Sequence, residues 1–185
     1  MAGGPAAGGP IQAVALVGPR AAGKSAVGRA LARELGWEFV DADAALAAAA
    51  GAEHAGQVLQ QRGEPAFRAL EEQVTAPLLE RSGAVVALGG GAVLSAVLRR
   101  ALQRPALLVA LLLAEPAVLA ARIGRSKTAR PPLTDLPLER EVDLLLAQRL
   151  PHYRAVADLE LDSGRGTPAS LARQLAARVR GGAGG

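Results

Sequence analysis

Residues 18–25 read G-P-R-A-A-G-K-S, which is the complete G-x-x-x-x-G-K-S pattern of a phosphate-binding loop, or P-loop. An apolar strand pattern precedes them and a helical pattern follows, so backbone N–H groups and the positive end of the helix would face the same phosphates. Lys24 would neutralise the β and γ phosphates of ATP, and Ser25 would offer its hydroxyl to Mg²⁺. The alternative is a glycine-rich turn that only caps a helix. The residues expected to contact the nucleotide are Gly18, Ala21, Ala22, Gly23, Lys24, Ser25 and Ala26.

Two carboxylates, Asp41 and Asp43, stand at alternate positions just after a second strand pattern. Open α/β sheets bind their ligands at the carboxyl ends of the strands. One carboxylate could therefore hold metal-bound water while the other accepts a hydroxyl group of a substrate. Aspartate is also a good helix N-cap, so Asp43 could have that role alone.

Two further segments have residue types suited to a ligand. Residues 63–68 read G-E-P-A-F-R and follow a helical pattern, and three glycines at 89–91 follow an apolar strand pattern. Consecutive glycines allow a backbone to approach a ligand closely, although they can also form a loose turn.

Short apolar runs alternate with longer helical patterns along the chain, which is typical of βαβ units around a parallel sheet. We therefore expect an α/β fold with helices on both faces of the sheet. The expected strands are residues 12–17, 38–40, 84–87, 106–113 and 158–161, and the expected helices are residues 24–35, 43–50, 66–81, 93–102, 116–123, 138–153 and 168–179. Residues 124–137 are polar, basic and rich in proline, which predicts a mobile surface loop.

The length of 185 residues suits one domain, which we expect over residues 11–180, with disordered tails at 1–10 and 181–185. The longest apolar stretch, residues 105–114, is too short to span a membrane, and the amino terminus does not resemble a secretory signal.

The chain has no cysteine and only two histidines, which excludes thiolate metal sites and a histidine zinc cage. We therefore expect a cytoplasmic protein.

The net charge of +4 could indicate nucleic acid, but the arginines are spread along the chain and often stand beside acids. Only two Phe, one Tyr and one Trp are available to stack on bases. A small anionic ligand explains the excess of positive charge equally well, so we expect small-molecule substrates, no nucleic acid or membrane partner, and a monomer.

Taken in order, these motifs resemble those of the shikimate kinase family over nearly the whole chain. That family has a P-loop, then D-x-D, G-E-x-x-F-R, G-G-G, a lid with R-P-L, and an arginine ahead of a Y-R pair. This chain has the first four with similar spacing. It continues with R-P-P-L at 130–133 and R-L-P-H-Y-R at 149–154. The resemblance implies a P-loop kinase fold with a mobile lid at about 124–137, and direct in-line transfer of the γ-phosphoryl of ATP to a ring hydroxyl of shikimate.

The resemblance also implies roles for residues on the acceptor side. Asp43 would bind hydroxyls of the acceptor and is a candidate base, and Arg68 and Arg149 would grip its carboxylate in a two-pronged geometry. Asp41 would hold the water shell of Mg²⁺. The glycines that would lie along the substrate are Gly89, Gly90 and Gly91.

On the nucleotide side, the resemblance implies that Arg130 arrives with the closing lid and stabilises the charge of the transferring phosphoryl group. Arg122 and Arg165 would sandwich or edge the adenine, or else be solvated surface charges. Two departures from the family pattern affect nucleotide affinity. Ala21 replaces a glycine and must take a right-handed conformation or be strained, and Ala26 replaces a threonine and has no hydroxyl for a phosphate.

Two other functions stay open. A kinase for another polyol or sugar acid, such as gluconate, would share the P-loop but would not need Arg68 and Arg149 to converge on one ring carboxylate. A non-catalytic ligand sensor on the same fold would not need the complete catalytic set, which consists of Lys24, Ser25, Asp41, Asp43 and Arg130.

Overall fold

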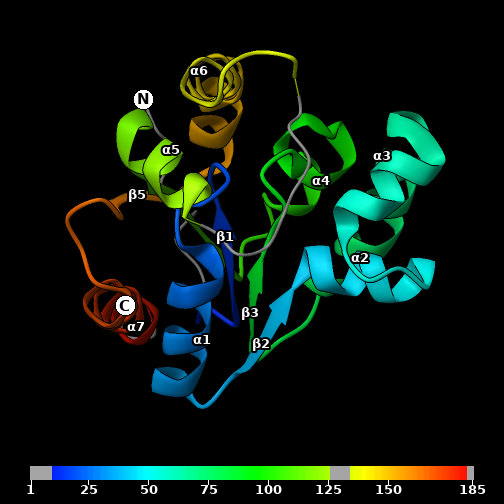
Figure 1. Cartoon of the computed structure of the whole chain (residues 1–185). Coiled ribbons are helices and arrows are strands. Elements are labelled where there is room, and N and C mark those ends of the chain that lie inside the picture. Colours follow the sequence, from blue (N-terminus) through cyan, green and yellow to red (C-terminus); the bar gives the residue numbers. More distant parts are fainter. Residues whose placement is uncertain (1–9, 126–133, 183–185) are drawn as a thin grey trace.

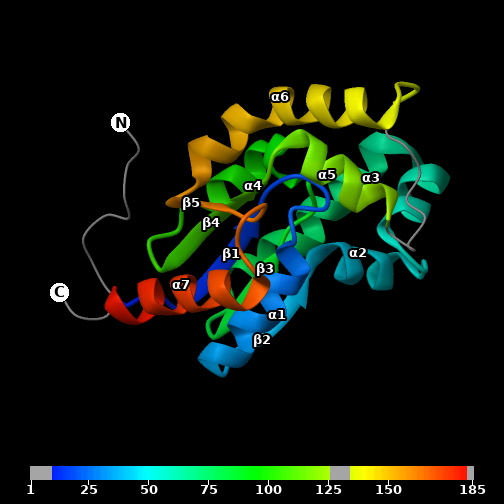
Figure 2. The same cartoon turned by 60° about the vertical axis from the view of Figure 1, so that its left-hand side comes forward.

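The structure, a computed structural model, describes residues 10–125 and 134–182. Parallel strands form a five-stranded sheet in the order β2-β3-β1-β4-β5, with helices on both faces (Figures 1 and 2). The strands are β1 (Ala13–Val17), β2 (Glu38–Asp41), β3 (Ala84–Ala87), β4 (Leu107–Leu113) and β5 (Leu159–Asp162). This arrangement confirms the expected α/β fold, and each expected strand is present to within one residue at either end.

The described helices also follow the expected pattern, with two corrections discussed below. They are α1 (Lys24–Leu35), α2 (Ala42–Ala50), α3 (Ala55–Leu79), α4 (Ala96–Ala101), α5 (Pro116–Gly124), α6 (Leu138–Val156), α7 (Pro168–Gly181) and the short 3₁₀ helix η1 (Ala92–Leu94).

The central strands are apolar throughout because the sheet is covered on both faces. Side chains alternate between the faces along each strand. In β1, Val14 and Leu16 pack with α1, α5 and α7, whereas Ala13, Ala15 and Val17 pack with α3, α4 and α6. The sheet therefore lies between two apolar layers, which fix the carboxyl ends of the strands relative to one another.

The strand order reverses beside β1, since the chain adds β3 on one side of β1 and β4 on the other. Ligands of open α/β sheets bind at such a reversal, outside the carboxyl ends of the strands. The P-loop leaves β1 at this point, and the triple glycine leaves the neighbouring strand β3.

The first correction concerns α3. The helix expected at 66–81 begins eleven residues earlier, at Ala55, and is interrupted at Gly63, whose φ of 74° and ψ of 168° are not helical. Proline at position 65 is tolerated there because it stands in the first turn after the break, where its missing N–H has no helical partner to lose. The break turns the chain ahead of Arg68.

The second correction concerns the helix expected at 93–102, which is divided into η1 and α4. Ser95 has an extended ψ of 125°, and its hydroxyl accepts a hydrogen bond of 3.1 Å from the N–H of Leu98. Serine caps helices well, so the division begins α4 at Ala96. The expected lid at 124–137 includes residues 126–133, which lie outside the described residues, as does Arg130.

Candidate active site

The P-loop connects β1 to α1 and has a conformation that requires its first glycine. Gly18 has a φ of 140°, and a Cβ atom there would come within 2.2 Å of the carbonyl oxygen of Leu112 on β4. The N-cap of α1, Gly23, has a φ of 87°, and no side chain caps the helix with a hydrogen bond. Lys24 lies along the loop, where its Nζ atom donates to the carbonyls of Gly18 and Pro19, each at 2.8 Å. The loop thus has a helix terminus without a side-chain cap, and it has the cation that phosphate binding needs.

Ala21 takes the strained alternative stated above. Its φ is 62°, which makes it the one residue other than glycine with positive φ in the described ranges. A left-handed backbone costs an L-residue with a Cβ atom about 1–2 kcal/mol. The Arg122 guanidinium donates to the carbonyl of Ala21 at 3.3 Å, so a side chain from α5 contacts the strained residue.

The two arginines expected near the adenine occupy different surroundings. Arg122 also donates to the carbonyl of Ser163 at 2.6 Å, so it bridges the P-loop and the segment after β5. Arg165 has a side chain that is 89% exposed and pairs with Asp162 at 3.6 Å. The structure therefore brings Arg122 to the P-loop and leaves Arg165 on the surface.

Ser25 and Asp41 meet at the start of α1 and the end of β2. The Ser25 hydroxyl donates to the Asp41 carboxylate at 2.8 Å, and the other carboxylate oxygen accepts a bond of 3.3 Å from the N–H of Ala44. Asp41 is thus the N-cap of α2, so the alternative that Asp43 is the cap is wrong. A hydroxyl and a carboxylate beside a phosphate-binding loop are hard oxygen ligands of the kind Mg²⁺ takes, with waters and phosphates completing its shell. The donor set therefore fits Mg²⁺.

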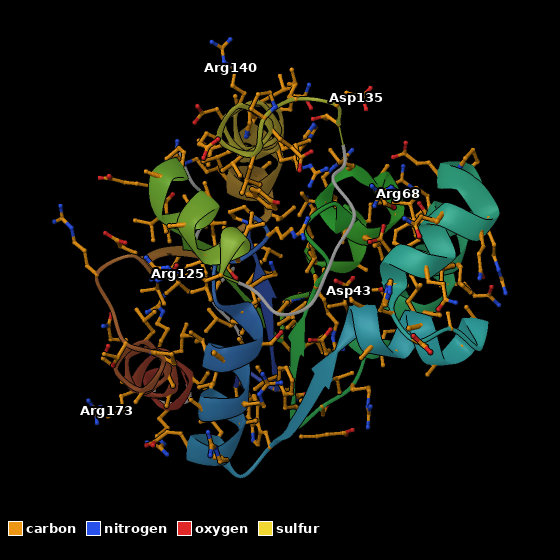
Figure 3. All side chains as sticks on the ribbon, in the orientation of Figure 1. Asp43, Arg68, Arg125, Asp135, Arg140 and Arg173 are labelled. Atoms are coloured by element: carbon orange, nitrogen blue, oxygen red, sulfur yellow. The ribbon has the colours of Figure 1, made fainter. Side chains whose placement is uncertain are left out.

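The triple glycine after β3 lies against charged groups from three helices. A Cβ atom on Gly89 would come 2.6 Å from Oδ1 of Asp43 and 3.1 Å from Oε1 of Glu71. The corresponding atom on Gly91 would come 2.7 Å from both terminal nitrogens of Arg68. The glycines thus make room for these side chains. Asp43 and Arg68 lie on the same side of the molecule, where α2 packs against α3 (Figure 3).

Arg149 joins this group from α6. A Cβ atom on Gly90 would lie 3.7 Å from Nη1 of Arg149. The same Cβ atom would lie 3.4 Å from the backbone nitrogen of Arg20 in the P-loop. The glycine segment therefore connects the P-loop to both arginines expected to grip a carboxylate.

Glu71 is a member of this group that sequence reasoning missed. It is 4% exposed, and its Oε2 atom accepts a bond of 2.7 Å from Nη1 of Arg68. Burial raises the pKa of Glu71 and nearby Asp43 adds to the rise, whereas the hydrogen bond and charge of Arg68 and the charge of Arg149 lower it. An available signal was its position three residues after Arg68 on a helix, where side chains meet.

Tyr153 is a second missed residue, although its Y-R motif was noted. Its hydroxyl donates to the carbonyl of Gly90 at 2.5 Å, and its side chain is fully buried. The following residue, Arg154, points elsewhere and pairs with Glu160 at 3.1 Å on the surface.

Together, these contacts bring the P-loop and a cluster of two arginines with two carboxylates to the glycine segment, while the serine–aspartate pair lies at the start of α1, where the P-loop ends. A phosphorylated nucleotide suits the P-loop, and a small acceptor with hydroxyl and carboxylate groups suits the cluster.

Comparisons with known proteins agree with this arrangement. A sequence model described as shikimate kinase matches residues 20–180. The chain is 40% identical over 166 residues to a shikimate kinase of Halorhodospira halophila, covering 90% of this chain and 92% of that protein. It is 37% identical over 170 residues to one of Xanthomonas euvesicatoria, covering 92% and 93%. The structure of an Acinetobacter baumannii shikimate kinase in complex with shikimate is similar at a TM-score of 0.85 and 33% identity, covering 92% of this chain and 94% of that one.

Proposed function

The chain belongs to the shikimate kinase family, and we propose that it transfers the γ-phosphoryl group of ATP to a ring hydroxyl of shikimate. The product is shikimate 3-phosphate, and the reaction serves aromatic amino acid biosynthesis through chorismate. The observation that carries the proposal is the meeting of Asp43, Arg68, Glu71 and Arg149 at the glycine segment beside the P-loop.

Shikimate, the acceptor, is a cyclic carboxylic acid with several hydroxyls. The cluster has arginines that suit the carboxylate and an aspartate that suits a hydroxyl. Arg68 and Arg149 would bind the carboxylate, since guanidinium donors match its two oxygens. Asp43 would accept a hydrogen bond from the hydroxyl that attacks, and Gly89, Gly90 and Gly91 would lie along the ring. Direct transfer in line needs mainly positioning and stabilisation of charge, which these groups provide together.

On the nucleotide side, Lys24 would leave the carbonyls of Gly18 and Pro19 and bind the β and γ phosphates instead. Arg122 stands beside the P-loop and would edge the adenine, whereas Arg165 would have to move inward to reach it. Arg130 would stabilise the transferring phosphoryl group from the lid; because it lies outside the described residues, this role rests on the sequence alone.

Ser25 and Asp41 would hold Mg²⁺, Ser25 by its hydroxyl and Asp41 through the water shell of the ion. When bound, the ion would supply positive charge beside the phosphates of ATP. The role of the two residues is to orient it at the start of α1.

We further propose that the chain acts as a monomer in the cytoplasm without nucleic acid or membrane partners. No helix within residues 10–125 and 134–182 has the length and apolar character needed to cross a bilayer. Some of the arginines lie far apart, since Arg140 and Arg173 point outward from separate ends of the molecule (Figure 3). A dispersed charge of this kind gives little attraction for a phosphate backbone.

A coupled assay of ADP release over shikimate, quinate, gluconate and nucleosides tests the proposed function. We expect turnover with shikimate, and little with its methyl ester, because the ester has no charge for Arg68 and Arg149 to bind. Losing one of these charge-assisted contacts should cost on the order of 2–4 kcal/mol. Turnover only with gluconate would favour the sugar-acid kinase, and binding of shikimate without ADP release would favour the sensor.

A further inference from the structure

Tyr153 is a buried polar residue that the proposed mechanism does not use. It is the one tyrosine of the chain and lies on α6 with an exposed fraction of 0%. Its ring packs in the apolar layer between the sheet and helices α3, α4 and α6. A phenylalanine would fill this space equally well, so packing alone does not account for the hydroxyl.

The hydroxyl of Tyr153 connects α6 to the glycine segment across 63 positions of sequence. It donates to the carbonyl oxygen of Gly90 at 2.5 Å. Burial raises the pKa of Tyr153 to about 12, so the phenol keeps its proton and remains a donor across the physiological range. Because a peptide unit is planar, a fixed Gly90 carbonyl also fixes the orientation of the peptide that leads into Gly91.

Arg149 stands four residues before Tyr153 and therefore on the same side of α6, with its guanidinium near the same phenol. The guanidinium lowers the pKa of Tyr153 through its charge and through a hydrogen bond, against the larger effect of burial. Arg149 also approaches Gly90, at 3.7 Å from the place of a Cβ atom. The Tyr153 hydroxyl thus binds the backbone on which the acceptor ring would lie, and an arginine expected to bind the carboxylate stands beside it.

Glycines have the widest choice of backbone conformations, so three in succession need external contacts to hold one of them. Gly89 and Gly91 lie against charged side chains, and Gly90 is held through its carbonyl. We propose that Tyr153 is a positioning residue for the acceptor site: its hydroxyl holds Arg149 and the Gly90 carbonyl in a fixed relation, and this relation sets where the acceptor carboxylate binds. The inference rests on the proposed function, since it concerns the same acceptor.

Steady-state kinetics of Tyr153→Phe test this role. The KM for the acceptor should rise about tenfold, as expected when a buried hydrogen bond between a positioning group and its partner is lost, with kcat and the KM for ATP within about twofold of wild type. The matched control is Val156→Ala, a buried apolar truncation one turn later on α6. It should lower the melting temperature without changing the KM for the acceptor. If Tyr153→Phe behaves like this control, the phenol only stabilises the fold and the proposal is wrong.

A double-mutant cycle separates action through Arg149 from a general effect. In the Arg149→Ala background, Tyr153→Phe should raise the KM for the acceptor by no more than about threefold, because the guanidinium that the phenol positions has already been removed. An undiminished tenfold effect would contradict the coupling. All variants are assayed with an acceptor that the wild-type protein phosphorylates. If the wild-type protein is inactive with shikimate, the proposed function is wrong, but the positioning role of Tyr153 can still be tested with the other acceptor.

A spectroscopic measurement keeps the phenol of Tyr153 in place. Since the chain has a single tyrosine, growth on 3-fluorotyrosine places one fluorine label in the protein, at Tyr153. The chemical shift of its ¹⁹F resonance should change when shikimate is added. In Arg149→Ala, the same addition should leave the chemical shift unchanged. A resonance that shikimate at saturation leaves unchanged in the wild-type sequence would overturn the proposal.

Discussion

Arg68 lies directly against Gly91: a Cβ atom at position 91 would come within 2.7 Å of both of its terminal nitrogens. Gly91 itself has an ordinary φ of −99°, so glycine is not required there by its backbone. The constraint comes from the Arg68 guanidinium, which occupies the space that a side chain at position 91 would fill.

We therefore expect Gly91→Ala to impair function more than stability. The new methyl group would displace the end of a flexible side chain, which costs the fold little, but Arg68 would lose its position against the acceptor. The KM for shikimate should rise on the order of tenfold or more, with a small change in melting temperature. Steady-state kinetics and thermal unfolding check both parts. Gly181→Ala, where an added Cβ meets nothing within 4 Å, is the control and should leave the KM unchanged.

The lysine of the P-loop gives a second prediction. Lys24→Met keeps the length of the side chain but removes the charge that would neutralise the phosphates, so phosphoryl transfer should fall on the order of 10²–10³-fold or more. Because Lys24 also donates to the carbonyls of Gly18 and Pro19, a loss of about 1 kcal/mol in the free energy of unfolding is expected.

The rate of ADP release and a urea unfolding curve measure the two effects of Lys24→Met. Arg173→Met, on the outward side of α7, removes a cation far from the P-loop and serves as the control (Figure 3). Wild-type rates in a folded Lys24→Met sample would exclude this lysine from the mechanism.

The strands were predictable because the pattern of each one is local in the sequence. Strands β1, β3 and β4 are short apolar runs covered on both faces, and such runs stand out against the helical patterns between them. The P-loop is similarly local, since its glycines, lysine and serine act within eight consecutive residues. Sequence therefore located the carboxyl ends of the strands and most of the side chains now found there.

The missed features depend on contacts between distant segments. Glu71 could have been a surface acid on α3, and only its burial beside Arg68 and Asp43 gives it a part in the site. Tyr153 resembles a core aromatic until its hydroxyl is seen to reach Gly90. Arg122 and Arg165 could not be distinguished by sequence, because their distance from the P-loop is set by the packing of α5 and the segment after β5.

The strained residue of the P-loop gives a third prediction. Ala21→Gly should relieve about 1–2 kcal/mol of left-handed strain, while the greater freedom of glycine in the unfolded chain costs about 0.4–1 kcal/mol. A net gain of about 0.5–1 kcal/mol in the free energy of unfolding is expected. The matched control is Ala22→Gly at the next position, a buried alanine without positive φ, which should lose about 1 kcal/mol. Urea unfolding measures both variants, and a loss of stability in each would contradict the assignment of strain to position 21.

Glu71 gives the last prediction, a dependence of stability on pH. Burial holds its pKa in the folded protein above the ordinary value near 4.5. A raised pKa means that the folded state binds the proton more tightly than the unfolded state, so the contribution to stability is complete below pH 4.5 and is lost as the pH rises through the folded pKa. The stability advantage of wild type over Glu71→Gln should therefore be largest in acid and should shrink as the pH increases.

Urea unfolding of both proteins in steps from pH 4 to pH 8 measures this difference. The charge of Arg68 and its hydrogen bond lower the pKa of Glu71, so removing them should raise that pKa further. In the Arg68→Ala background, the loss of the wild-type advantage should therefore move to higher pH. An advantage that grows as the pH rises would mean that Arg68 outweighs burial and that Glu71 is held as a carboxylate more firmly than in the unfolded chain. In that case the ion pair between Glu71 and Arg68, rather than the buried environment, would control the protonation of this part of the acceptor site.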